Sequence, residues 1–295
     1  GTVTSPTLAA RIRALLEKYP EARWHRYEPV NRDNAFEGSR MAFGEYVNTT
    51  YRFDRADVIL ALDADFLFGD PGALRYARDF ADKRRVLDGN TEMSRLYAVE
   101  STPSLTGSMA DNRLRLRPSQ VEGFARALAQ ALGIEADGEA VSGVPAEWLS
   151  AVVSDLQGAR GRSLVVAGDG QPPVVHALAH AINAALGNAG QTVIYTDPVE
   201  ADPVNHMQSL AELVNDMNAG QVDCLLILEQ NPVYSAPADL QFAEAMSKVR
   251  RRIHLGLYAD ETAALCHWHI PAAHYLEAWG DVRAFDGTAS VIQPL

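Results

Sequence analysis

The sequence has few cysteines and no long run of apolar residues. Cys224 and Cys266 are the only two cysteines in 295 residues, too few for a disulfide framework or a four-thiolate iron–sulfur site. No apolar stretch approaches the ~20 residues that cross a bilayer, and no basic-then-apolar leader is present. We therefore expect no direct membrane insertion by this chain.

Basic residues are also scarce. Lysine and arginine number 26 against 38 aspartates and glutamates, which gives a formal net charge of -12 and a pI near 5.1. No basic stripe is present to displace counterions from a phosphate backbone, so we expect no nucleic-acid partner. The chain also lacks a Gly-x-Ser-x-Gly elbow and any histidine spacing typical of a catalytic triad. Hydrolase chemistry has no support in the sequence.

What the sequence does have is an alternation of helical and strand patterns. The runs 57–63 and 163–167 are short and almost wholly apolar, as expected of strands buried on both faces of a parallel sheet. Between them, the stretch 133–145 is rich in Gly, Ala, Asp and Glu and has no periodicity. The pattern predicts an α/β protein of two doubly wound, mostly parallel, Rossmann-like modules, 1–136 and 145–295.

The same patterns place the other elements. Helices are expected at 6–19, 34–45, 71–85, 119–132, 145–157, 172–187, 207–219 and 237–247, and strands at 96–100, 192–195, 224–228 and 253–257.

Functional side chains are expected at the carboxyl ends of the strands, because ligands of open α/β sheets bind there. Gly168 opens a loop between a strand and a helix, where backbone N–H groups could face a phosphate. The loop lacks a third glycine and the Walker lysine, so a plain βα turn is the alternative. Asp63 and Asp65 put negative charge where a pyrophosphate needs donors. For these aspartates the alternative is that they cap the next segment.

Asn231 begins an Asn-Pro turn after the strand 224–228. Asn side chains close turns through their own backbone, and proline fixes the direction in which the chain leaves. A structural turn and a contact with a ligand both remain open for this residue.

The segment 266–277 contains one cysteine, three histidines and Glu277, which are side chains that zinc accepts. In a strand, Cys266 faces away from His267 and His269. We therefore expect no metal here. We expect instead a packing and docking surface built on aromatic rings, those of Trp268, Tyr275 and Trp279.

Several long stretches resemble one protein family. They are 51–60, 62–67, 71–72, 75–81, 93–97, 104–111, 267–271 and 279–281, and they span nearly the whole chain. These stretches are similar to the molybdopterin-oxidoreductase-like subunit of the bacterial alternative complex III, a respiratory quinol-oxidising assembly. The resemblance implies the central α/β layers of a molybdopterin oxidoreductase.

The pattern of the broader molybdopterin enzymes is only partly retained. Ala56-Asp57 and Ala110-Asp111 are present, but Asp63-Ala64-Asp65 replaces a small-Asn turn and Glu100-Ser101-Thr102 replaces Asp-Pro-Arg. The changed residues would repel or ignore a pterin dinucleotide. The resemblance thus implies a degenerate pterin site at six positions, Asp63, Asp65, Glu100, Asp111, Gly168 and Asn231.

The resemblance also implies a setting for the chain. It implies no cofactor in this chain, and molybdopterin and iron–sulfur clusters in the parent family. The implied partners are other subunits of a membrane-bound respiratory complex and further parts of the same polypeptide, at the periplasmic face of the bacterial inner membrane. Gly1 without an initiator Met and the strand-like end 291–295 predict an excised piece with a truncated C-terminus.

Two functions stay open. One is a scaffold of an electron-transfer complex that is inactive by itself. The other is the pterin-dinucleotide-binding part of an active molybdopterin-dependent oxidoreductase.

Overall fold

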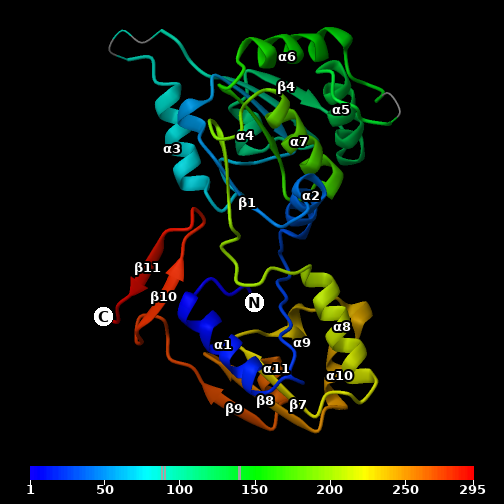
Figure 1. The fold of residues 1–295 in the computed structure, drawn as a ribbon, viewed down its shortest axis with the longest axis vertical. Helices are drawn as coiled ribbons and strands as arrows, with labels where there is room; N and C mark the ends of the chain where they lie inside the picture. The colour runs from blue at the N-terminus through cyan, green and yellow to red at the C-terminus, as the bar shows by residue number, and fades with distance from the viewer. Residues whose placement is uncertain (88, 90, 139–140) are drawn as a thin grey trace. The chain divides into compact units, whose positions relative to one another are not determined.

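The computed structural model describes residues 1–87, 89, 91–138 and 141–295, and the chain divides into two compact units (Figure 1). The central unit is Asn34–Pro198, and the terminal unit joins Gly1–Asp33 to Val199–Leu295. This division differs from the predicted modules 1–136 and 145–295. The reason is that β5 (Ser163–Ala167), assigned by the sequence to the second module, pairs with β2 (Val58–Leu62) of the first.

A four-stranded parallel sheet forms the middle of the central unit, in the order β4-β3-β2-β5. β3 is Arg95–Glu100 and β4 is Asn112–Arg115. β2 and β5 are buried along their whole length, which agrees with their continuous apolar sequences. β3 and β4 lie on one side of β2, and β5 lies on the other. The strand order therefore reverses between β2 and β5, which makes this pair the topological switch point of the sheet.

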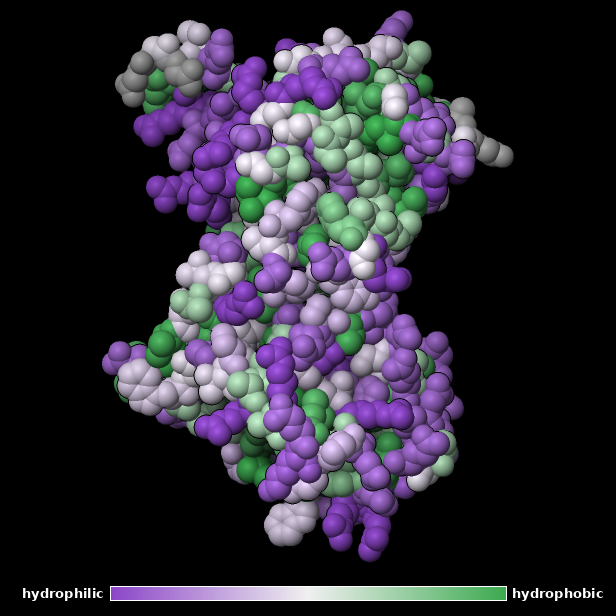
Figure 2. All heavy atoms as spheres, viewed as in Figure 1, coloured by the Kyte–Doolittle hydropathy of each residue, from purple (hydrophilic) through white to green (hydrophobic). Residues whose placement is uncertain are grey.

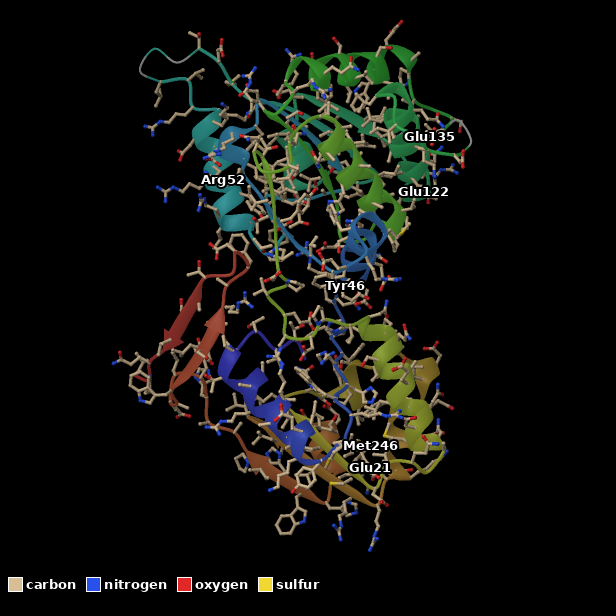
Figure 3. The ribbon with its side chains drawn as sticks, in the orientation of Figure 1. Glu21, Tyr46, Arg52, Glu122, Glu135 and Met246 are labelled. Atoms are coloured by element: carbon tan, nitrogen blue, oxygen red, sulfur yellow. The ribbon has the colours of Figure 1, made fainter. Side chains whose placement is uncertain are left out.

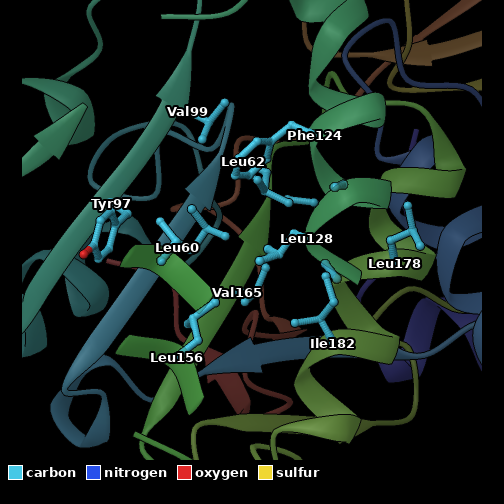
Figure 4. Packing of buried hydrophobic residues seen from close by; sticks show 14 of the residues in the cluster. Leu60, Leu62, Tyr97, Val99, Phe124, Leu128, Leu156, Val165, Leu178 and Ile182 are labelled. Carbon is cyan, nitrogen blue, oxygen red and sulfur yellow. The ribbon is translucent and has the colours of Figure 1, made fainter. Parts of the chain in front are cut away.

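The core of the central unit forms between this sheet and three long helices, α5 (Pro118–Ala131), α6 (Ala146–Gly158) and α7 (Pro173–Ala185). Figure 4 shows Phe124, Leu156 and Ile182 from these helices around Leu60 and Val165 of the strands. A second cluster of buried rings lies beside α3 (Ala73–Lys83) and the 3-10 turn η1 (Phe53–Arg55). Its members are Phe53, Phe66, Tyr76 and Phe80.

The central unit also contains α2 (Asp33–Phe43), the short α4 (Leu105–Ser108) and a two-stranded antiparallel ribbon. The ribbon pairs β1 (Asn48–Tyr51) with β6 (Val193–Thr196). The predicted strand at 192–195 is therefore present, but it belongs to this ribbon and not to a parallel sheet.

The terminal unit contains a three-stranded parallel sheet in the order β7-β8-β9. The strands are β7 (Cys224–Leu228), β8 (Arg251–Gly256) and β9 (Trp268–Pro271). One face of β7 packs against α8 (His206–Asn218) and α10 (Phe242–Ser247), which bury Leu225 and Ile227. α1 (Pro6–Lys18) lies instead beside a hairpin of β10 (Gly280–Arg283) and β11 (Ala289–Ile292).

The predicted α/β class with parallel sheets is confirmed. The long helix predicted at 237–247 is wrong, because the chain there forms η2 (Ala238–Leu240) and then the shorter α10. Gln241, with φ of 48°, stands between the two in the left-handed region and interrupts a continuous helix. Among the described residues, no helix combines the length and the apolar character needed to cross a membrane.

Candidate functional site

The candidate site lies at the carboxyl edge of the four-stranded sheet, where the loops after β2 and β5 leave the switch point. Asp63 follows β2 with φ of 51°, in the left-handed region. Its N–H donates to the carbonyl of Val99 at 2.7 Å, and its Oδ2 accepts a hydrogen bond from Gln171 Nε2 at 2.8 Å. The carboxylate of Asp63 is therefore held by the loop after β5.

Gly168 shows how closely the two loops approach each other. A Cβ atom at this position would lie 1.9 Å from the carbonyl oxygen of Asp63, a separation that no side chain could tolerate. The N–H of Gly168 donates to the carbonyl of Leu62 at 2.9 Å. The two loop backbones are thus in close contact at the sheet edge where open α/β sheets bind dinucleotides.

The helix that follows this loop offers few backbone donors. Pro172 is the N-cap of α7 and Pro173 is its first residue, and neither has an N–H group. The N–H of Gln171 donates to the carbonyl of Gly168 at 2.9 Å. Gln171 is 2% exposed, and within the described part of the chain its Oε1 has no hydrogen-bond partner. The loop therefore presents a buried acceptor, whereas a phosphate requires donors.

Asp65 also makes an internal contact. Its Oδ1 accepts from the N–H of Thr106 at 2.9 Å and from the Thr106 hydroxyl at 2.8 Å. Thr106 is fully buried, and its hydroxyl oxygen accepts in turn from the N–H of Leu67 at 3.2 Å. The carboxylate thus ties the loop after β2 to the start of α4, which is a capping role.

Glu100 is buried at the end of β3. Its carboxylate pairs with Arg113 Nε at 2.5 Å and accepts from the Ser104 hydroxyl at 2.6 Å. A Cβ at Gly107 would lie 1.7 Å from Glu100 Oε1, so the carboxylate occupies the space beside that glycine. An internal ion pair therefore stands where the broader molybdopterin pattern has Asp-Pro-Arg.

Asp111 lies at the opposite, amino edge of the sheet. It precedes β4, and its Oδ2 accepts from the N–H of Leu96 at 2.8 Å. Arg84 binds both carboxylate oxygens, at 2.7 and 2.8 Å, and this hydrogen bonding holds the pKa of Asp111 below its ordinary value. Asp57 precedes β2 at the same edge and pairs with Arg162. Both retained Ala-Asp motifs therefore stabilise the starts of strands.

Asn231 lies in the terminal unit, separate from the other five positions. Its Oδ1 accepts from the Thr262 hydroxyl at 2.7 Å, and its Nδ2 donates to Glu261 Oε2 at 2.6 Å. Its carbonyl accepts from the N–H groups of Tyr234 and Ser235. These contacts are those of a structural turn. Of the six candidates, the structure thus brings together only Asp63, Asp65, Glu100 and Gly168, in the loops at one sheet edge.

The segment 266–277 contains no cluster suited to a metal. No group of three or more His, Cys, Asp or Glu able to hold a metal ion occurs among the described residues. His269 instead stacks on the buried His254 of β8, with their Nδ1 atoms 3.0 Å apart. His274 and Glu277 contact each other through the His274 N–H. The aromatic rings predicted for a docking surface, Trp268, Tyr275 and Trp279, are exposed.

Sequence reasoning missed the partners of the candidate carboxylates. Gln171, Thr106 and Arg113 each satisfy one of them, yet none stood out in the sequence. Gln171 lies in the Gly168 loop, and that position was the one available signal. Thr106 and Arg113 are recognisable only after the strands are placed side by side.

The sequence also did not reveal a surface hollow of about 320 Å³ in the central unit. Figure 2 shows hydrophobic residues gathered around α7 and α2, and Figure 3 places Glu135, at the rim, on the α5 side. The buried polar side chain that lines the hollow is His180, whose Nδ1 lies 3.1 Å from the Tyr195 hydroxyl. Burial lowers the pKa of His180 to about 4 and raises that of Tyr195 to about 12. The hollow offers apolar packing with one neutral imidazole.

The two parallel sheets define an α/β protein, and comparisons with known proteins narrow this class. No family model matches the chain. In an alignment of 284 positions that covers 83% of this chain, it is 25% identical to the menaquinone reductase molybdopterin-binding-like subunit of Nitratidesulfovibrio vulgaris. The chain spans 40% of the length of that relative.

Two solved structures share the fold. Acetylene hydratase from Pelobacter acetylenicus matches 97% of this chain and 54% of its own, with a TM-score of 0.62 and 14% identity. A chain of the formyltransferase/hydrolase complex FhcABCD from Methylorubrum extorquens, in complex with methylofuran, matches 100% of this chain and 84% of its own, with the same score and identity. The curated relative confirms the resemblance to molybdopterin-oxidoreductase-like subunits, and the two solved structures show that the fold is shared.

The residues at the carboxyl edge of the central sheet do not fit a pterin dinucleotide. A pyrophosphate needs N–H or cationic donors, but Asp63, Asp65 and Glu100 place carboxylates there. Of the two arginines near this end of β4, Arg113 is paired with Glu100, and Arg115 ends the strand level with Glu100 and is exposed. At the switch point, Gly168 and Asp63 bring the two loop backbones into close contact.

Proposed function

We propose that this chain is a structural part of a molybdopterin-oxidoreductase-like subunit in a respiratory quinol-oxidising electron-transfer complex. In this proposal it holds no molybdenum and catalyses no reaction itself. The observation that supports it most is the closed switch point. The Cα of Gly168 lies against the carbonyl of Asp63, and the buried Gln171 side chain binds the Asp63 carboxylate at 2.8 Å.

The other candidate residues support the same role. Asp65 is bound to Thr106, and Glu100 is bound to Arg113. Glu100 uses both of its carboxylate oxygens, and Asp65 uses one, in contacts that connect neighbouring loops of the chain. Such contacts suit a sheet that serves as a framework for other parts of an assembly.

The proposal includes partner subunits at the periplasmic face of the bacterial inner membrane. Its support is the similarity to alternative complex III, together with the names of two relatives. One is called a subunit of menaquinone reductase, and the other comes from the FhcABCD complex. Since the chain spans 40% of the curated relative, any electron transfer would involve other parts of the protein.

The alternative is the pterin-dinucleotide-binding part of an active molybdopterin-dependent oxidoreductase. One observation favours it, namely that Gln171 Oε1 is buried and has no partner among the described residues. A buried acceptor without a partner costs free energy, and an N–H group of a bound base would satisfy it.

The test is the cofactor content of the intact subunit. It is purified in parallel with an active molybdopterin enzyme from the same host, which shows that the host supplies the cofactor. Molybdenum and tungsten are measured by elemental mass spectrometry, and pterin by fluorescence after oxidation. We expect neither metal nor pterin in stoichiometric amount. Stoichiometric pterin that is lost in a Gln171→Met variant would establish the alternative instead.

A further inference from the structure

The three-stranded sheet of the terminal unit has one covered face and one open face. Along β7, exposure alternates from residue to residue, as strand geometry requires. Leu225 and Ile227 are buried with α8 and α10, whereas Leu226 between them is 49% exposed. Cys224 and Leu228 lie on the same side as Leu226 and are exposed too.

Two apolar rows cross this open side of the sheet. In the first row, Leu226 stands level with Ile253 of β8 and Trp268 of β9, and Trp268 is 70% exposed. In the second row, Leu228 stands level with Leu255 and with Ile270, which is 49% exposed. These six residues are called the open face below.

The covered side of the same sheet is the more polar one. The row that contains Ile227 continues through His254 of β8 to His269 of β9. A sheet with one solvated face normally turns its apolar residues to the core and its polar residues to water. Here the fully apolar rows face outward, so this sheet is built to be covered on both faces.

The crossovers of this sheet cannot supply the missing layer. The chain proceeds from β7 to β8 to β9 in one direction across the sheet. Right-handed crossovers in one direction place their helices on one face, and α10 lies on the face that α8 covers. The other long helix of the unit, α1, is attached to β10 through hydrogen bonds from Ser5 and Thr7 to Asp281. In the part of the chain that the structure describes, Leu226, Leu228, Trp268 and Ile270 of the open face are exposed, while Ile253 and Leu255 in its middle strand are half-buried.

We propose that the open face is covered by a helical segment of the same polypeptide outside residues 1–295. Two observations favour this occupant. Parallel sheets are covered on both faces by helices of their own domain, because each crossover passes over the sheet. The curated relative is longer than this chain, which spans 40% of its length, so a protein of that kind has further polypeptide available. The proposal does not depend on the absence of a pterin.

Cys224 is a natural probe for this contact, because it lies beside the open face and is exposed. The full-length polypeptide, purified without partner subunits, is pulsed with N-ethylmaleimide, and alkylation at Cys224 is followed by peptide mass spectrometry. The reference rate is that of the same cysteine in urea. We expect alkylation in the native protein to be at least about 100-fold slower than in urea, because access requires the covering segment to open.

A Val30→Cys variant supplies the matched control in the same unit, since Val30 is 92% exposed. That cysteine should react at nearly its rate in urea. In a separate measurement, Leu226→Lys should lower the Tm of the full-length protein, with Leu226→Ala as the milder change, while Val30→Lys should leave it unchanged.

Three results would overturn the proposal. One is a Cys224 that reacts as fast in the native full-length polypeptide as in urea. Another is protection that appears only when partner subunits are added, which would assign the face to a partner. The third is protection that grows with protein concentration, which would assign it to a second copy of the chain.

Discussion

Asp63 and Gln171 join the two sides of the switch point through a hydrogen bond of 2.8 Å between Oδ2 and Nε2. One residue follows β2 and the other follows β5, so a contact between side chains 108 positions apart fixes the edge at which such sheets bind ligands. If this edge is structural, substitutions there should change the free energy of unfolding.

Gly168→Ala should destabilise the protein by at least about 2 kcal/mol, since an overpacked backbone contact has no easy relaxation. The added methyl would meet the Asp63 carbonyl at 1.9 Å, and that carbonyl is held in place by the strand. Urea unfolding of the wild type and the variant measures the loss. Gly170→Ala is the matched control, because a Cβ there meets nothing within 4 Å, and its effect should stay within about 1 kcal/mol. Equal effects of the two substitutions would contradict the close approach of the loops.

Glu100→Gln should cost about 1–3 kcal/mol, because it leaves the Arg113 guanidinium without its counter-charge at a partly buried position. The figure is below that of a fully buried pair because the Arg113 side chain is 29% exposed. Glu122→Gln removes a contact to Arg126 on α5 in which the carboxylate is 37% exposed, against 6% for Glu100, and should cost under about 0.5 kcal/mol. The free energies of unfolding of both variants are measured by urea unfolding. A cost for Glu100→Gln as small as that for Glu122→Gln would show that the Glu100–Arg113 pair is dispensable.

The sequence predicted the fold class and most element positions, because continuous apolar runs and helical periodicity are local signals. The strands 57–63 and 163–167 were placed within one residue of β2 and β5 at each end. Their partnership was not predictable, since β5 joins β2 across more than 100 positions through packing rather than local pattern. The short strand Asn112–Arg115 was missed because three of its four residues are polar.

The candidate site was predictable as a location but not as a set of contacts. Asp63, Asp65 and Gly168 were found because they follow buried strands. Asp111 was also found by motif, yet it lies at the amino edge, where it binds Arg84. A motif gives no information on which edge of the sheet a residue occupies until the strand that follows it is known, and that strand carried no clear pattern.

Zinc should leave the Tm of the protein unchanged. The histidines of β9 do not converge with Cys266 or Glu277, and His269 is already in contact with His254. A zinc site normally takes four ligands, so two stacked imidazoles are insufficient. Thermal melting is followed during titration with zinc chloride. A large rise in Tm at one equivalent, absent in a His267→Ala and His269→Ala double variant, would reveal a site.

Acid should destabilise the central unit through His180. Burial lowers the pKa of this imidazole from 6.5 to about 4 in the folded protein. The contribution of His180 to the free energy of unfolding is fully present above pH 6.5. As the pH falls from 6.5 to about 4, the unfolded chain binds a proton at His180 and the folded protein does not, so this contribution is lost. The loss is on the order of 3 kcal/mol, given that a one-unit shift is worth about 1.4 kcal/mol.

Urea unfolding at a series of pH values measures this loss. A His180→Gln variant should lose correspondingly less stability over this range, whereas His267→Gln, at an exposed histidine, should behave as the wild type. If the pH dependence of His180→Gln matched that of the wild type, His180 would not be buried in its neutral form.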